Sequence, residues 1–147
     1  MASELSCTFC KIIKGDPSAV LVYKDDYFLA LMDNHPINTG HLLVMPRQHY
    51  ETLLDMPLNE VGRLFILVAR ITKAVKNAMK ADGIQIGQNN GRAARQVINH
   101  VHVHIIPRFF DDSLGGSRPL RKDATLLELR NAAEAIEKEF KDSLNTS

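Results

Sequence analysis

Two groups of residues with chemically active side chains stand out in this sequence. Its 2 cysteines, Cys7 and Cys10, have Cys-x-x-Cys spacing, and three of its 6 histidines, His100, His102 and His104, alternate along one segment. In an extended strand, alternate side chains share a face and lie about 6.5–7 Å apart, so neighbouring imidazoles can converge on one small ligand. A cysteine pair at this spacing indicates metal binding or redox chemistry rather than a structural disulfide.

The alternating histidines are compatible with two kinds of chemistry. In one, the imidazoles hold a catalytic metal ion that keeps an open coordination position. In the other, one imidazole acts as a nucleophile or base, and its neighbours bind an anion. Residues 88–96, just before the histidines, form a loop rich in amides and glycine, the kind that presents N–H groups to phosphate oxygens. No Asp or Glu lies between Gly83 and Arg108, which favours phosphate binding over a hydrolytic metal site.

The composition places these residues in one domain. The chain has 147 residues, 45% of them hydrophobic and 24% charged, which is enough for one full core. Lys and Arg number 18 against 17 Asp and Glu, so the basic excess expected of a partner of nucleic acid polymers or anionic membranes is missing. The sequence contains no apolar run of about 18 residues and no secretory signal pattern. We therefore expect a cytoplasmic protein without a membrane or nucleic acid polymer as partner.

Hydrophobic periodicity predicts the elements that position the reactive residues. A helical turn is expected at 7–14 and strands at 20–23, 27–32, 42–45, 84–87 and 97–106. Apolar residues recur every three or four positions over 58–79 and again over 124–141, which predicts two longer helices. The segment 109–122 is expected to be irregular. This order predicts an α+β fold with a mainly antiparallel five-stranded sheet, one long helix and one C-terminal helix.

The segment around the histidines is similar to a known family signature. Residues 89–107 read Asn-Asn-Gly-x-x-Ala-x-Gln-Val-x-x-His-Val-His-Val-His-Ile-Ile-Pro, which resembles the His-φ-His-φ-His-φ-φ motif of the histidine-triad (HIT) nucleotide-binding superfamily. Further similarity at residues 9–13, 23–26 and 31–49 extends the resemblance to about residues 7–108. The Cys7/Cys10 pair resembles the Hint-type branch of this superfamily, whereas its diadenosine polyphosphate hydrolases typically lack the pair.

The resemblance implies a single HIT domain over residues 1–147, with a core at about 7–108 and an irregular segment and helix at 109–142. It also implies a two-fold homodimer whose sheet continues across the interface. By similarity, His102 attacks the α-phosphorus of a purine nucleotide and forms a phosphohistidine intermediate, which water then cleaves. His104 would donate to the phosphoryl oxygens or the leaving group, and His41 would lie beside it.

The same resemblance assigns residues to nucleotide binding. Asp33 matches the acidic residue that accepts hydrogen bonds from the ribose hydroxyls. The groups expected to steady the phosphate are Asn89, Gln96 and the backbone N–H of Val97. The apolar positions that sandwich the base match Phe9, Ile12 and Leu31. Apolar residues at these last positions are equally typical of an ordinary hydrophobic core.

The resemblance further implies one structural zinc ion per chain. Its four ligands would be Cys7, Cys10, His49 and His100, which would close a tetrahedral site. A free or redox-active thiol pair is the alternative. Arg95 departs from the family pattern, which usually has Gly there. A Gly permits a positive φ, and an Arg side chain in its place either points outward or reaches additional substrate phosphates.

These features together predict an enzyme that cleaves purine nucleoside 5′-phosphoramidates, or nucleotides with a related leaving group, and releases a monophosphate such as AMP or GMP. Two alternatives remain. One is a diadenosine polyphosphate hydrolase, and the other is a nucleotide-binding regulatory or scaffold protein in which hydrolysis is incidental.

Overall fold

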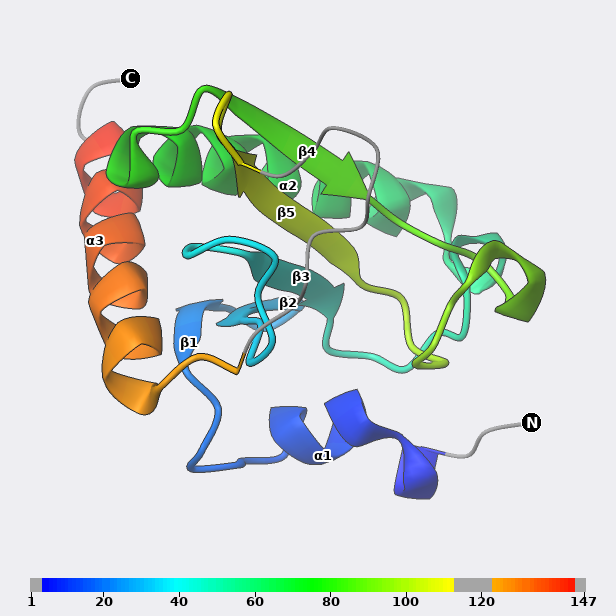
Figure 1. Cartoon of the computed structure of the whole chain (residues 1–147). Coiled ribbons are helices and arrows are strands. Elements are labelled where there is room, and N and C mark those ends of the chain that lie inside the picture. The colour runs from blue at the N-terminus through cyan, green and yellow to red at the C-terminus, as the bar shows by residue number, and fades with distance from the viewer. Residues whose placement is uncertain (1–3, 113–122, 145–147) are drawn as a thin grey trace.

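A computed structural model describes residues 4–112 and 123–144 and contains one antiparallel sheet (Figure 1). Its strands are β1 (Leu21–Lys24), β2 (Phe28–Met32), β3 (Leu42–Pro46), β4 (Gly83–Gly87) and β5 (Val103–Arg108). They lie in the order β1-β2-β3-β5-β4, and every neighbouring pair is antiparallel. The expected five-stranded sheet is therefore confirmed. Of the segment expected to be irregular, residues 113–122 lie outside the described residues.

Three α-helices and three short 3-10 turns accompany the sheet in the described part of the chain. The helices are α1 (Thr8–Ile13), α2 (Leu58–Met79) and α3 (Leu126–Leu144). The 3-10 turns are η1 (Glu4–Ser6), η2 (Leu53–Asp55) and η3 (Arg92–Ala94). These bounds confirm the expected long helix and C-terminal helix to within three residues at each end. Among the residues described, no helix has the length and apolar character needed to cross a membrane.

The two faces of the sheet are covered by different helices. On one face, α2 and α3 pack on a core that includes Met32, Leu42, Ile71 and Ile136. The other face carries Leu29, Leu31, Leu43 and Met45, which pack with residues of α1. Figure 1 shows α1 set apart from α2 and α3. Successive side chains along β2 and β3 point alternately to the main core and to the α1 side. Because both faces are covered, every residue of these two strands is buried.

The predicted start of the strand at 97–106 is wrong. The observed strand β5 begins only at Val103, and the preceding backbone makes other hydrogen bonds. The N–H of Val101 donates to the carbonyl oxygen of Tyr50 at 2.8 Å, and the N–H of His100 donates to that of Ile98 at 2.9 Å. Since these donors bond outside the sheet, the chain before Val103 does not join the ladder.

The expected side-chain directions nevertheless hold. Val101, Val103 and Ile105 are fully buried in the main core, as predicted. The intervening imidazoles lie on the opposite side, because the Phe9 ring of α1 contacts both His100 and His102. The alternation of an extended chain therefore persists beyond the hydrogen-bonded strand.

Candidate metal site and active-site cleft

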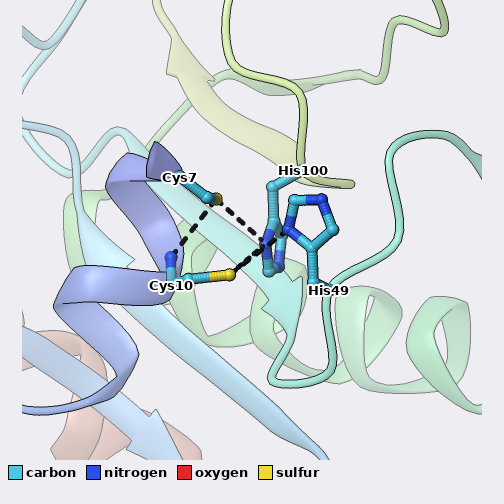
Figure 2. Close-up of side chains that lie close together, drawn as sticks. All are labelled: Cys7, Cys10, His49 and His100. Carbon is cyan, nitrogen blue, oxygen red and sulfur yellow. Dashed lines mark hydrogen bonds between the residues drawn. The ribbon is translucent and has the colours of Figure 1, made fainter. Parts of the chain in front are cut away.

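Two cysteine sulfurs and two histidine nitrogens form a cluster next to the helix α1. Figure 2 shows Cys7 and Cys10 reaching toward the imidazoles of His49 and His100, and the four ligand atoms lie within 4.8 Å of one another. The His100 Nδ1 is 3.5 Å from the Cys7 Sγ and 3.6 Å from the Cys10 Sγ, and the His49 Nδ1 is 3.2 Å from the Cys10 Sγ. In a tetrahedral zinc site, such sulfur–nitrogen separations are about 3.5 Å. The donor set and its spacing therefore fit a metal ion of this type.

Local backbone structure explains how these ligands come together. Cys7 is the N-cap of α1, and its Sγ accepts a hydrogen bond from the Cys10 N–H, which brings both thiols to one end of the helix. The His100 Nε2 donates to the Pro46 carbonyl oxygen at 2.8 Å, so the proton sits on Nε2 and Nδ1 presents a lone pair to the sulfurs. An outer hydrogen bond of this kind orients a metal-binding histidine. The Nε2 of His49 is buried without a hydrogen-bond partner.

Burial also sets the protonation of the cluster. Desolvation, together with the hydrogen bond to Cys7, raises the pKa of the Cys10 thiol to about 12. Desolvation lowers the pKa of His100 to about 4, so that its imidazole is neutral at pH 7, as a ligand must be. A thiol with a raised pKa is a poor partner in thiol exchange, whereas a bound metal ion deprotonates it. The cluster therefore suits metal binding better than redox chemistry.

An open cleft of about 340 Å³ adjoins this cluster. The predicted site residues that line it are Phe9, Ile12, Leu31, Asp33, Asn89, Val97, His102 and His104. Further lining residues are Thr8, Met32, Asn34, His35, Leu43, Arg95 and Ile98. Leu43 was missed by sequence reasoning, although its alternation with the core residue Val44 along β3 already placed it on the α1 side. His41 and Gln96 do not line the cleft.

The ring of His102 is held by a single backbone contact. Its Nδ1 lies 2.7 Å from the carbonyl oxygen of His100, which can only accept, so Nδ1 carries the proton. The remaining nitrogen, Nε2, therefore has a lone pair on a ring that lines the cleft. Desolvation lowers the pKa of His102, which keeps the imidazole neutral. A neutral ring fixed in this tautomer is suited to nucleophilic attack.

The imidazole of His104 forms a hydrogen bond with the fully buried imidazole of His41. The N–H of Ile37 donates to the His41 Nδ1 at 3.0 Å, so His41 carries its proton on Nε2. That Nε2 lies 2.9 Å from the His104 Nδ1 and 3.5 Å from the Asp33 Oδ2. Donation from His41 places the proton of a neutral His104 on Nε2. The ring centroids of His102 and His104 are 5.2 Å apart, so a ring with a free lone pair is next to a ring with an N–H donor.

The fully buried position of His41 depends on a glycine before it. Gly40 has a φ of +97°, and a Cβ there would lie 2.6 Å from the Cγ of Met79. The His41 N–H donates to the Asn38 carbonyl oxygen at 3.1 Å, which closes the turn into β3. The position of His41 beside His104 therefore depends on a backbone conformation that glycine adopts easily.

Asp33, His41 and His104 also form a second group of metal-ligand type, with ligand atoms within 4.8 Å of one another. The two histidine nitrogens that face each other already share the 2.9 Å hydrogen bond. A proton relay and a metal site are both chemically reasonable uses of this group, and metal stoichiometry separates them.

Gln96 fixes the loop behind the cleft. Its side chain is only 6% exposed. Its Oε1 accepts from the Gly91 N–H at 2.7 Å, and its Nε2 donates to the carbonyl oxygens of Glu51 and Ile98 at 2.6 and 3.0 Å. The amide is thus occupied by the backbone, which positions the loop rather than contacting the cleft.

The backbone of Arg95 has the conformation that a glycine would adopt most easily. Its φ is +68°, in the left-handed region, and it ends the turn η3. This conformation costs a residue with a Cβ about 1–2 kcal/mol. The Arg95 side chain is exposed and lines the cleft.

Comparisons with known proteins agree with this geometry. A model of the HIT domain family matches residues 14–111. An adenylylsulfatase of Arabidopsis thaliana is 40% identical over 122 residues, which cover 83% of this chain but only 62% of that relative. An adenosine 5′-monophosphoramidase of Candida albicans is 37% identical over 74% of each chain. A zinc-bound histidine triad family protein of Mycobacterium smegmatis has a similar structure, with a TM-score of 0.85, 31% identity and coverage of 99% of this chain and 100% of that one.

Proposed function

Because this chain belongs to the HIT domain family, we propose that it is a hydrolase of purine nucleoside 5′-phosphoramidates, or of nucleotides with a related leaving group. Its products would be monophosphates such as AMP or GMP. The observation that carries the proposal is the tautomer of His102, whose Nδ1 is bonded to the backbone while Nε2 belongs to a ring lining the cleft. The phosphoramidase of Candida albicans, at 37% identity, supports the same substrate class.

The proposed reaction has two displacements at phosphorus. The lone pair on the His102 Nε2 forms a bond to the α-phosphorus, and the bond to the leaving nitrogen breaks with its electron pair. The His104 N–H donates the proton that the leaving amine needs. Water then attacks the phosphohistidine and returns its proton to His104, while the electron pair of the P–N bond returns to His102. The net reaction adds water and restores both imidazoles.

The rest of the cleft would bind the nucleotide. Asp33 accepts the His35 N–H at 2.9 Å and lines the cleft, where its carboxylate would also accept hydrogen bonds from the ribose hydroxyls. The base would lie among Phe9, Ile12 and Leu31, and the phosphate would meet Asn89 and the Val97 N–H. Gln96 acts as a positioning residue through the loop it holds.

We also propose one structural zinc ion per chain, bound by Cys7, Cys10, His49 and His100. Four protein ligands would close the coordination sphere, so the ion would contribute folding energy rather than a reactive water. The site would tie α1, and with it Phe9, to the histidine segment. The sulfur–nitrogen distances of 3.2–3.6 Å and the zinc-bound relative of Mycobacterium smegmatis support this assignment.

A homodimer whose sheet continues across the β4 edge completes the proposal. β4 is an edge strand, and its Ile86 is 47% exposed, while Ile66 of α2 is 63% exposed. An apolar edge strand is a template for pairing with a second copy. Light scattering is expected to report a dimer for the wild type and a monomer for Ile86→Lys. A wild-type monomer would contradict this part of the proposal.

We further propose that residues 1–147 act as one HIT domain in the cytoplasm. Cys7 and Cys10 are both unpaired, which suits a compartment that keeps thiols reduced.

The decisive experiment measures turnover of adenosine 5′-phosphoramidate beside diadenosine tetraphosphate. Wild type is compared with His102→Ala and with the near-isosteric His102→Gln. We expect wild type to prefer the phosphoramidate and both variants to be inactive but folded. Preference for the dinucleotide would instead identify a polyphosphate hydrolase. Tight AMP binding without turnover of either substrate would support a regulatory protein.

A further inference from the structure

We propose that Arg95 forms a second anion site in the cleft and extends the proposed hydrolase to nucleotides whose leaving group is itself anionic, such as a sulfate or a single further phosphate. The inference rests on the proposed hydrolysis and names a substrate class for it. Three features of Arg95 carry it, namely its backbone conformation, its position and its lack of an acidic partner.

The first feature is the left-handed backbone. In the described part of the chain, the residues other than glycine with a positive φ are Lys80 and Arg95. Both residues end a helical segment, Lys80 the helix α2 and Arg95 the 3-10 turn η3, but only Arg95 also lines the cleft. The loop around Arg95 uses a glycine, Gly91, at its other positive-φ position. A glycine at position 95 would adopt the same backbone with less strain, so a strained arginine in a binding loop points to a role for its side chain.

The second feature is the position of the side chain. Arg95 lines the cleft with Asn89 and Val97, the residues proposed to meet the phosphate, and with His102 and His104. A guanidinium among these groups is placed to meet atoms attached to the reacting phosphorus.

The third feature is the availability of its charge. Within residues 4–112 and 123–144, no carboxylate forms an ion pair with Arg95. The two other arginines between positions 83 and 108 differ from Arg95. Arg108 is bound to both carboxylate oxygens of Asp112, at 2.9 and 3.0 Å, and Arg92 is exposed outside the cleft lining. Arg95 therefore combines an unpaired charge with access to a ligand.

The chemistry of the cleft indicates which ligands would benefit. The lining of the cleft offers one permanent cation, Arg95, and one carboxylate, Asp33, among the described residues. The planar guanidinium matches the oxygens of sulfate or phosphate with paired N–H donors, but a neutral amine gains nothing from it. When His102 attacks a nucleotide carrying sulfate, the P–O bond breaks and its electron pair leaves on the sulfate. Arg95 would neutralise that charge, and no proton is needed.

The test compares two substrates with the same nucleotidyl half. We expect Arg95→Ala to lower kcat/KM for adenosine 5′-phosphosulfate by about 10- to 100-fold, the effect of losing a hydrogen bond to a charged group. The phosphoramidate should change less than about threefold, because its leaving group is not anionic. Arg95→Gly should match Arg95→Ala although it relieves strain, and Arg95→Lys should retain part of the preference. Arg92→Ala is the matched control. Equal losses on both substrates, or no loss on either, would overturn the inference.

A binding measurement separates this inference from the proposed function. Calorimetry compares ADP with AMP, since ADP carries an extra phosphate at the leaving-group position. We expect the ratio of the two affinities to fall about tenfold in Arg95→Ala and to stay unchanged in Arg92→Ala. If this ratio falls as expected but wild type turns over neither substrate, the anion site is supported and the proposed hydrolase function is rejected. An unchanged ratio in Arg95→Ala would reject the anion site even where wild type hydrolyses the phosphoramidate.

Discussion

Two neighbouring groups of histidines in this molecule have opposite arrangements. In the cluster, His100 is fully buried and its ring nitrogen faces two thiols. In the cleft, His102 is half-buried and lines an open cavity. Both rings bond a backbone carbonyl, but His100 does so through Nε2 and His102 through Nδ1. The two rings therefore differ in their surroundings: the free nitrogen of His100 faces two thiols, whereas the ring of His102 faces an open cleft.

The two regions are also physically joined. The carbonyl oxygen of His100 holds the His102 ring, so one residue serves both regions. The Phe9 ring lies 5.9 Å from the His100 ring and 5.0 Å from the His102 ring. Loss of the metal cluster is therefore expected to disturb the nucleophile, whereas loss of the nucleophile should leave the cluster intact.

The largest expected effect is the contrast between His102→Ala and His100→Ala. His102→Ala should lower phosphoramidate turnover by about 10³-fold or more, because no other ring replaces the nucleophile. The metal content of His102→Ala, measured by elemental analysis, and its Tm should equal those of wild type. His100→Ala should lose the metal and much of the stability as well. A His102→Ala protein that loses its metal would break the comparison.

Next in size is the effect of removing the metal. Zinc removal by a strong chelator, or the Cys10→Ser substitution, should lower the free energy of unfolding by about 3 kcal/mol or more, since binding energy at a structural site is folding energy. Denaturant titration measures this loss. The chelator should not destabilise Cys10→Ser further, which makes the variant its own control. A wild type that is insensitive to chelation and has titratable thiols would instead support the free thiol pair.

A third prediction concerns proton donation. His104→Ala should lower kcat/KM for the phosphoramidate by about 100-fold, because the leaving amine needs a proton. The loss for adenosine 5′-phosphosulfate should be smaller, since sulfate leaves without one. Equal losses on the two substrates would contradict the role of His104 as proton donor. Two metal ions per chain, with the weaker one required for turnover, would reassign Asp33, His41 and His104 to a metal site.

The smallest effect is expected for Phe9→Leu. This change keeps an apolar side chain but removes the edge contacts with both imidazoles, which are worth about 0.5–1.5 kcal/mol. We expect kcat to fall about fivefold with a smaller change in KM, because the loss acts on the orientation of His102. A rise in KM alone would show that Phe9 serves only the nucleoside pocket.

Local sequence patterns predicted which helices and strands form, but not every position at which they begin. Helical spacing over 58–79 and the alternation of Val101, Val103 and Ile105 are local patterns, and the structure agrees with both. The late start of β5 was not predictable, because it depends on a hydrogen bond from Val101 to the distant Tyr50.

The candidate site shows the same division. The four residues that the resemblance grouped as metal ligands lie close together, and eight of the residues predicted for catalysis or nucleotide binding line one cavity. The tautomer of His100 escaped prediction because the Pro46 carbonyl that fixes it lies 54 positions away in the sequence. The buried position of Gln96 likewise follows from the carbonyl of Glu51, a long-range contact that no local pattern indicates.

The central claim is that the His102 Nε2 becomes bonded to phosphorus during turnover. Rapid quenching of wild type with adenosine 5′-phosphoramidate, followed by peptide mass spectrometry, measures this directly. We predict a transient adduct of one nucleoside monophosphate on the peptide containing His102, localised to that residue and absent from His102→Ala. An adduct on another residue, or turnover by His102→Ala at the wild-type rate, would contradict the account.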